Sequence, residues 1–140
     1  RSGEAAVVEV GLLLHPRFQD TGRHCNAYIN IYIIRPMKPL CFVGSCKDDL
    51  SGFPREARLA AGMELWQVQN GLMPSDFKPM LTIGTGVYEI RVHALGEWRV
   101  LYVAKFAEAI YVSHAFQKKT PKTAKTDIDL ATKRYKMIGD

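Results

Sequence analysis

Long apolar runs are missing from the sequence. A membrane-spanning helix needs roughly 18 or more consecutive apolar residues, and the apolar segment Ala5–Leu14 is interrupted by Glu9 and stops at His15 and Pro16. The hydrophobic content of 47% is ordinary and the mean hydropathy is close to zero. We therefore expect a soluble globular protein, and 140 residues suffice for one domain with one core.

Cysteine is also scarce. The sequence has three cysteines, Cys25, Cys41 and Cys46, which is an odd number, and their spacing fits no metal site. Disulfide-stabilised secreted domains need a denser set of cysteines, so this count favours a reduced, cytoplasmic chain. Since no His, Cys, Asp or Glu cluster has the spacing of metal ligands, we expect neither a metal nor another cofactor.

Acidic residues are outnumbered by basic ones. The chain has 19 Lys and Arg against 14 Asp and Glu, a formal net charge of +5, and its pI is about 9.2. This balance favours an acidic partner, either nucleic acid or an acidic protein. The pI alone does not distinguish between them.

Three consecutive β-strands joined by short turns are predicted between residues 86 and 119. They cover Val87–His93, Trp98–Lys105 and Ile110–Gln117. Successive strand residues point to opposite faces, which gives the sheet one apolar face and one charged face. The residues predicted to face a packed helix are Tyr88, Ile90, Val92, Trp98, Val100 and Tyr102.

The first turn predicts how these strands pair. The segment Ala94-Leu95-Gly96 fits a three-residue hairpin loop that ends on a glycine with positive φ. That register pairs His93 with Glu97, Arg91 with Arg99, and Glu89 with Leu101. Like charges placed opposite each other destabilise a sheet. We interpret the two arginines as a phosphate site, with neutralisation by Glu89 in an ion cluster as the alternative.

The second turn predicts the faces of the third strand. If Lys105 pairs with Ala109, then Tyr111, Ser113, Ala115 and Gln117 share the face of Arg99. His114 then points to the apolar side as a hydrogen-bonded core histidine, unless a bulge turns it round.

Further elements are predicted on both sides of the hairpin. They are a strand over Lys38–Gly44, a short helical turn from Asp48 to Phe53, a helix from Pro54 to Asn70-Gly71, a loop over Met73–Thr85, and a last helix from Thr126. We interpret residues 1–36 as an N-terminal extension of uncertain origin and residues 37–140 as the domain, because Met37 resembles a native start. Apolar segments of residues 1–36 are expected to add to a free sheet edge.

The segments YEIRV, EWRVLYVAKF and IYVSHAFQKKTPKT, with the helix that follows them, resemble the phage-derived branch of the RelE/HigB toxin family over residues 37–138. The resemblance implies an α+β fold, RelE/ParE-like, in which a small curved antiparallel sheet is flanked by N-terminal helices and a C-terminal helix. Members of this family cut messenger RNA, in many cases on the ribosome. They are toxins held inactive by a small antitoxin that is often a helix-turn-helix protein.

By position, the resemblance implies that Arg99 contacts the scissile phosphate and that Arg91 is a second basic contact. Lys118, or its neighbour Lys119, matches the basic or acid–base residue after the last strand. For metal-independent attack by a 2′-hydroxyl, Glu89 is the candidate base. The candidates for the acid, or for further charge stabilisation, are Lys118 and His114. The residues expected to bind RNA are Lys78, Gln117, Lys119 and Lys122.

Two other functions fit the same sequence. Related folds include toxins that inhibit DNA gyrase without cutting RNA. The third interpretation is a phage-derived protein that binds nucleic acid or a protein partner without catalysis, in which case the arginine face binds RNA with strong salt dependence and leaves it intact.

Overall fold

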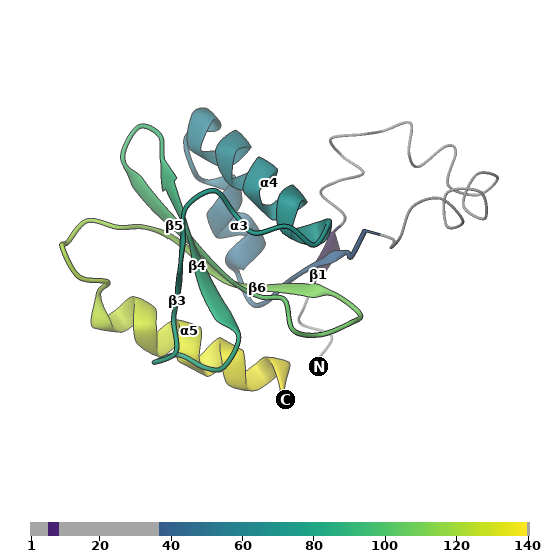
Figure 1. The fold of residues 1–140 in the computed structure, drawn as a ribbon. Coiled ribbons are helices and arrows are strands. Elements are labelled where there is room, and N and C mark those ends of the chain that lie inside the picture. Colours follow the sequence, from purple (N-terminus) through teal and green to yellow (C-terminus); the bar gives the residue numbers. More distant parts are fainter. Residues whose placement is uncertain (1–5, 9–36, 140) are drawn as a thin grey trace.

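The structure is a computed structural model that describes residues 6–8 and 37–139 (Figure 1). In the described part of the chain, a six-stranded sheet runs in the order β1-β2-β6-β5-β4-β3. The elements are β1 (Ala6–Val8), β2 (Leu40–Phe42), α3 (Cys46–Ser51), α4 (Arg55–Gln69), β3 (Phe77–Pro79), β4 (Val87–His93), β5 (Glu97–Val103), β6 (Ile110–Gln117) and α5 (Lys125–Ile138). The predicted α+β class is confirmed. None of these helices is both long enough and apolar enough to cross a membrane.

The sheet is mixed, where an antiparallel sheet was expected. Strand β2 pairs with β6 in parallel, and the other pairs are antiparallel. The parallel pair arises because α3, α4 and three strands separate β2 from β6 in the chain. At the outer edge, β1 pairs with β2, which confirms the edge pairing for Ala6–Val8. The other apolar segment of residues 1–36 lies outside the described residues, and the domain boundary at residue 37 stays a prediction.

Helix α4 begins and ends where its signals predict. Pro54 precedes its first residue, and the Pro54 carbonyl accepts a hydrogen bond from the Arg58 amide at 2.8 Å. Asn70 follows the last residue, and Gly71 has the positive φ of +84° that a helix-ending glycine supplies.

Strand β3 was not predicted from the sequence, because three residues that include a proline carry no alternating pattern. It pairs with β4, and Lys78 lies opposite Glu89.

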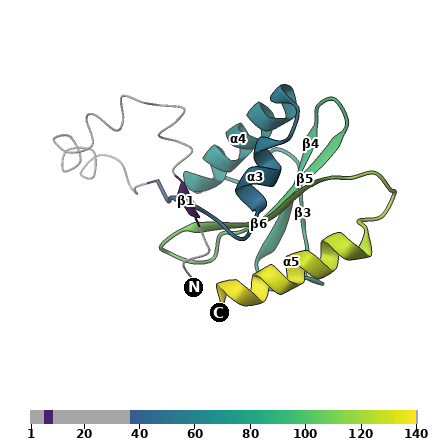
Figure 2. The same cartoon turned by 180° about the vertical axis from the view of Figure 1, so that it is seen from behind.

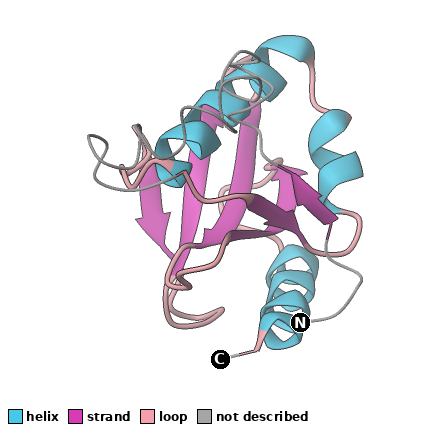
Figure 3. Ribbon diagram, turned by 90° about the vertical axis from the view of Figure 1, so that its right-hand side faces the viewer, coloured by secondary structure: helices cyan, strands magenta, loops and turns pink. Residues whose placement is uncertain are grey.

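Both faces of the sheet are covered by helices. Helices α3 and α4 lie on one side and α5 on the other (Figures 1 and 2), and Figure 3 shows the strands between them. The α4-side core contains the predicted residues Ile90, Val100 and Tyr102. On the α5 side, Val87 and Leu101 belong to a second core. The face expected to be charged is therefore apolar under α5, and its charged part lies at the hairpin end.

A β-bulge changes the third strand's faces. The register of β5 and β6 shifts between Leu101 and Tyr102, so that Leu101 pairs with His114 while Tyr102 pairs with Val112. Ser113 is the extra residue, and its carbonyl accepts a hydrogen bond from Nη1 of Arg134 on α5 at 3.0 Å.

The predicted faces hold only for the part of β6 before the bulge. Beyond it, His114 and Phe116 lie on the α5 side, so the prediction that placed them on the α4 side is wrong. The bulge itself was the stated alternative.

Candidate nucleic-acid interface

The hairpin brings the two arginines opposite each other, as predicted. Arg91 pairs with Arg99, His93 with Glu97, and Glu89 with Leu101. In the connecting loop, Gly96 has φ +122°, which favours glycine. The preceding Leu95 also has a positive φ, +55°.

Glu89 lies between the two guanidinium groups. Its Oε1 is 3.7 Å from Nε of Arg91 and 3.8 Å from Nε of Arg99. Arg99 also donates from Nη1 to Glu97 at 3.1 Å and to the Trp98 carbonyl at 2.9 Å. Of the two interpretations offered for this pair, the structure shows the ion cluster.

Burial decides which of these groups a ligand reaches. Arg99 is only 5% exposed and Glu89 3%, whereas the side chain of Arg91 is 35% exposed. A phosphate held between the two arginines, as predicted from the sequence, needs both guanidinium groups on an accessible surface, and Arg99 is buried. The long side chain of Arg99 extends towards the carboxylates of Glu89 and Glu97 and is buried there. Strand alternation predicts the face of the sheet on which a side chain lies, but not whether other side chains cover it. The catalytic roles given to these residues stay predictions.

His93 adds an outer layer that the sequence interpretation missed. Its Nε2 lies 2.6 Å from Oδ2 of Asp76, and its Nδ1 lies 2.8 Å from the Glu97 carboxylate. Because ionised carboxylates only accept hydrogen bonds, both ring nitrogens act as donors. The hydrogen bonds to Asp76 and then to Glu97 raise the pKa of His93, and the bond to His93 lowers the pKa of each carboxyl. The pairing with Glu97 was visible in the register, but Asp76 comes from a loop.

We call these six residues the hairpin charge cluster. It contains as many carboxylates as cations: Asp76, Glu89 and Glu97 with Arg91, His93 and Arg99. The charges cancel when His93 is protonated. The cluster is not fully hydrogen-bonded, because Oε2 of Glu89 and Nε of both arginines are buried without a hydrogen-bond partner among the described residues.

His114 is a hydrogen-bonded core histidine, but on the α5 side of the sheet. Its Nε2 lies 2.8 Å from Oδ1 of Asp127 in the first turn of α5, and its ring stacks on Phe116 at 4.8 Å. Burial, the largest cause, lowers the pKa of His114. The His114 side chain is 6% exposed, so it offers a substrate little contact surface.

Three of the predicted lysines, Lys118, Lys119 and Lys122, lie where β6 leaves the sheet. The side chains of Lys119 and Lys122 are exposed and that of Lys118 is partly exposed. None of the three forms an ion pair with another described residue. The Lys118 amide donates to the Glu97 carbonyl at 2.8 Å, which holds this segment against the hairpin. Lys78 on β3 is likewise exposed.

A cavity of about 140 Å³ lies beside these lysines, and we call it the β6–α5 cavity. Its lining residues are Phe116, Gln117, Lys118, Lys119, Thr120, Ala124 and Asp127. The structure thus brings together three predicted residues, Gln117, Lys118 and Lys119. It adds Asp127, which lies in the first turn of the helix predicted from Thr126 and was not among the predicted site residues.

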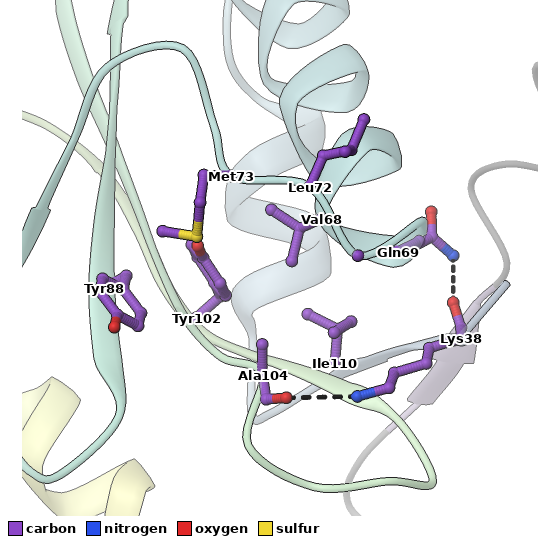
Figure 4. A pocket seen from close by; sticks show the side chains of 10 residues that line it. Lys38, Val68, Gln69, Leu72, Met73, Tyr88, Tyr102, Ala104 and Ile110 are labelled. Atoms are coloured by element: carbon purple, nitrogen blue, oxygen red, sulfur yellow. Dashed lines mark hydrogen bonds between the residues drawn. The ribbon is translucent and has the colours of Figure 1, made fainter. Parts of the chain in front are cut away.

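A larger cavity of about 250 Å³ lies on the α4 side (Figure 4). It is lined by Lys38, Val68, Gln69, Gly71, Leu72, Met73, Tyr88, Tyr102, Ala104 and Ile110. Lys38 donates from Nζ to the Ala104 and Phe106 carbonyls at 3.3 and 2.8 Å, so its charge is engaged. Burial raises the pKa of Tyr102 and keeps its hydroxyl protonated. This cavity carries none of the predicted chemistry.

Within the described residues, no group of three or more His, Cys, Asp or Glu side chains is arranged to hold a metal ion.

Residues 48–136 match the family model described as phage derived protein Gp49-like (DUF891). The matched segment begins within α3 and ends within α5. It therefore includes the hairpin charge cluster and the β6–α5 cavity. No curated protein matches the chain.

Proposed function

The chain belongs to the Gp49-like family of phage-derived proteins, and from this premise we propose that it is the toxin of a type II toxin–antitoxin pair and cleaves messenger RNA. The family is known as a RelE-like toxin family. The observation that carries the proposal is the group of lysines without ion-pair partners among the described residues at the exit of β6, Lys118, Lys119 and Lys122. The partly exposed Arg91 lies on the same sheet, on β4, with β5 between it and β6.

The distribution of charge supports RNA as the ligand. The hairpin charge cluster is balanced within itself, so it adds little to the chain's net charge of +5. The lysines at the β6 exit are available for phosphates, and phosphate contacts supply most of the sequence-independent affinity for nucleic acid. Arg91 extends this positive surface onto the hairpin, because a third of its side chain is exposed.

The proposed reaction needs charge stabilisation more than a complete acid–base pair. The 2′-oxygen attacks the phosphorus, its proton leaves to a base, and the 5′-oxygen departs with a proton from an acid. Arg91 and Lys118 stabilise the charge on the phosphate, and Lys118 is also the reachable candidate acid. Glu89 and His114 are too buried to contact the ribose, so we assign Glu89 to positioning Arg91. A ribosome that orients the RNA would supply the remaining acceleration.

Two partners belong to this proposal: the ribosome, and a small antitoxin, of helix-turn-helix type, encoded by a neighbouring reading frame. The expected result of expressing the chain alone in bacteria is growth arrest with broken transcripts. Coexpression with the neighbouring gene product should restore growth.

A matched set of lysine variants tests the interface. The double variant Lys118→Gln/Lys119→Gln should abolish growth arrest and RNA cleavage. Lys47→Gln removes an exposed charge from α3, on the other side of the sheet, and should change neither. An intact transcript pool with growth arrest and a DNA-damage response would instead identify gyrase as the target. Arg99→Ala is a poor test, because it would leave Glu89 buried beside one guanidinium fewer.

The burial of Arg99 and Glu89 favours a second candidate function, RNA binding without catalysis. In that case the wild-type chain binds RNA and leaves it intact. The slope of log affinity against log salt should fall by about 1 for each lysine removed in the Lys118→Gln and Lys119→Gln single variants. Incubation of the purified chain with ribosomes and messenger RNA separates the two functions, since only the nuclease produces fragments.

A further inference from the structure

The β6–α5 cavity is the right size for part of a ligand. Its volume of about 140 Å³ is below the roughly 300–1,000 Å³ of pockets that enclose a whole drug-sized molecule. It is lined on one side by the basic exit of β6 and on the other by the first turn of α5. A cavity of this kind suits one unit of a chain whose phosphates lie outside on the lysines.

Asp127 is the carboxylate in this lining, and His114 fixes its orientation. Burial lowers the pKa of His114, so the imidazole is neutral near pH 7 and donates a single N–H from Nε2 to Oδ1 of Asp127 at 2.8 Å. Oδ2 of Asp127 makes no hydrogen bond with any described residue. The side chain is 25% exposed, which leaves that oxygen available to a ligand.

The remaining lining matches a nucleotide. Phe116 is 9% exposed and one face of its ring stacks on His114, so it contributes a small apolar contact to the cavity, and bases pack readily against aromatic side chains. Lys118 and Lys119 have no ion-pair partner among the described residues, so they can hold the flanking phosphates. Gln117 adds an amide with both donor and acceptor atoms. A carboxylate, an aromatic ring and two cations therefore surround one small space.

We propose that the β6–α5 cavity is a base-binding subsite whose Asp127 carboxylate selects guanine. An ionised carboxylate only accepts hydrogen bonds. Guanine presents two neighbouring donors, N1–H and the exocyclic N2 amino group. Oδ2 accepts one of them, and Oδ1 accepts the other with the lone pair that its single bond from His114 leaves. Uracil presents one N–H between two carbonyl oxygens, and these oxygens repel the carboxylate. The subsite rests on the proposed function, because it specifies which base the bound RNA places here.

The test compares two nucleotides on the full chain. Guanosine 3′-monophosphate and uridine 3′-monophosphate are titrated into the wild-type protein and followed by NMR chemical shifts. Guanosine 3′-monophosphate should bind at least about fivefold more tightly, the low end of what one bidentate contact discriminates. Equal affinities, or no binding of either nucleotide at millimolar concentration, would overturn the proposal.

Two variants assign the discrimination to Asp127. Asp127→Asn keeps the size of the side chain and an acceptor oxygen for His114, but it replaces the other oxygen with a donor, so the preference for guanine should disappear. Lys119→Gln should weaken both nucleotides equally and leave their ratio unchanged. A preference that survives in Asp127→Asn refutes the assignment.

The base-binding subsite and the proposed nuclease function can be refuted independently of each other. Cleavage of RNA without a guanine preference would refute the subsite alone. Guanine-selective nucleotide binding by a chain that neither cuts RNA nor arrests growth would refute the nuclease alone.

Discussion

Replacement of Glu89 by glutamine tests the central feature of the charged face. Glu89 is 3% exposed and faces two guanidinium groups. Removing one partner of a buried ion pair typically costs about 3–5 kcal/mol of stability. Arg99 keeps Glu97 at 3.1 Å and Arg91 keeps Asp76 at 3.9 Å, so we expect the low end, about 3 kcal/mol.

The measurement is urea denaturation of wild type and Glu89→Gln, with the free energy of unfolding extrapolated to water. Glu56→Gln is the matched control, because Glu56 is an exposed carboxylate in the first turn of α4. Its loss should cost less than about 1 kcal/mol, the usual size of a helix-dipole contribution. A cost for Glu89→Gln no larger than that of the control would refute the description of a buried ion cluster.

The same variant separates two roles of Glu89 in function. If Glu89 only neutralises and positions the arginines, Glu89→Gln adds one net positive charge to the cluster, and RNA affinity should rise while cleavage persists. If Glu89 is the catalytic base, cleavage should be lost while RNA binding remains. Filter binding and fragment analysis on one preparation of folded variant give both readings, and we expect the first.

Two further predictions concern packing and pH. A Cβ on Gly84 would lie 2.4 Å from Cε2 of Tyr135, so Gly84→Ala should lower the free energy of unfolding by about 1–3 kcal/mol. A Cβ on Gly62 in α4 meets nothing within 4 Å, so Gly62→Ala should raise the free energy of unfolding by about 0.5–1 kcal/mol. Equal effects of the two variants in denaturation would contradict this prediction. Because the pKa of His93 is raised, its contribution to folding stability is complete below the usual pKa of 6.5 and is lost as pH rises through the folded-state pKa. Because the pKa values of Asp76 and Glu97 are lowered, their contributions to folding stability are lost as pH falls below the usual values of 3.8 and 4.5. The destabilisation caused by His93→Gln should therefore be largest between about pH 5 and 6.5, and a stability difference from wild type that does not change with pH would contradict the arrangement.

Local patterns in the sequence were sufficient for most of the elements. Alternating residues predicted β4 and β6 with their observed ends, and the glycine-containing turn predicted the pairing of Arg91 with Arg99. Proline and Asn-Gly signals predicted the limits of α4. These succeeded because a hairpin register and a helix cap depend on residues close together in the chain.

Contacts between distant segments decided the rest. The bulge at Ser113 is held by Arg134 of α5, and it moved His114 to the face where Asp127 could receive its hydrogen bond. The parallel pairing of β2 with β6 depends on how the chain returns after the intervening strands.

The sequence by itself determined that the two arginines would lie opposite each other, because a tight turn leaves the strands one register. Only the tertiary structure decided what that pair could bind. Burial of Arg99 depends on side chains that the fold places over it, and the carboxylate of Asp76 comes from a loop seventeen positions before His93. Charge compensation acts through space, so the pattern of charges along the chain could not show that both arginines are paired with carboxylates while Lys118, Lys119 and Lys122 form no ion pair with another described residue.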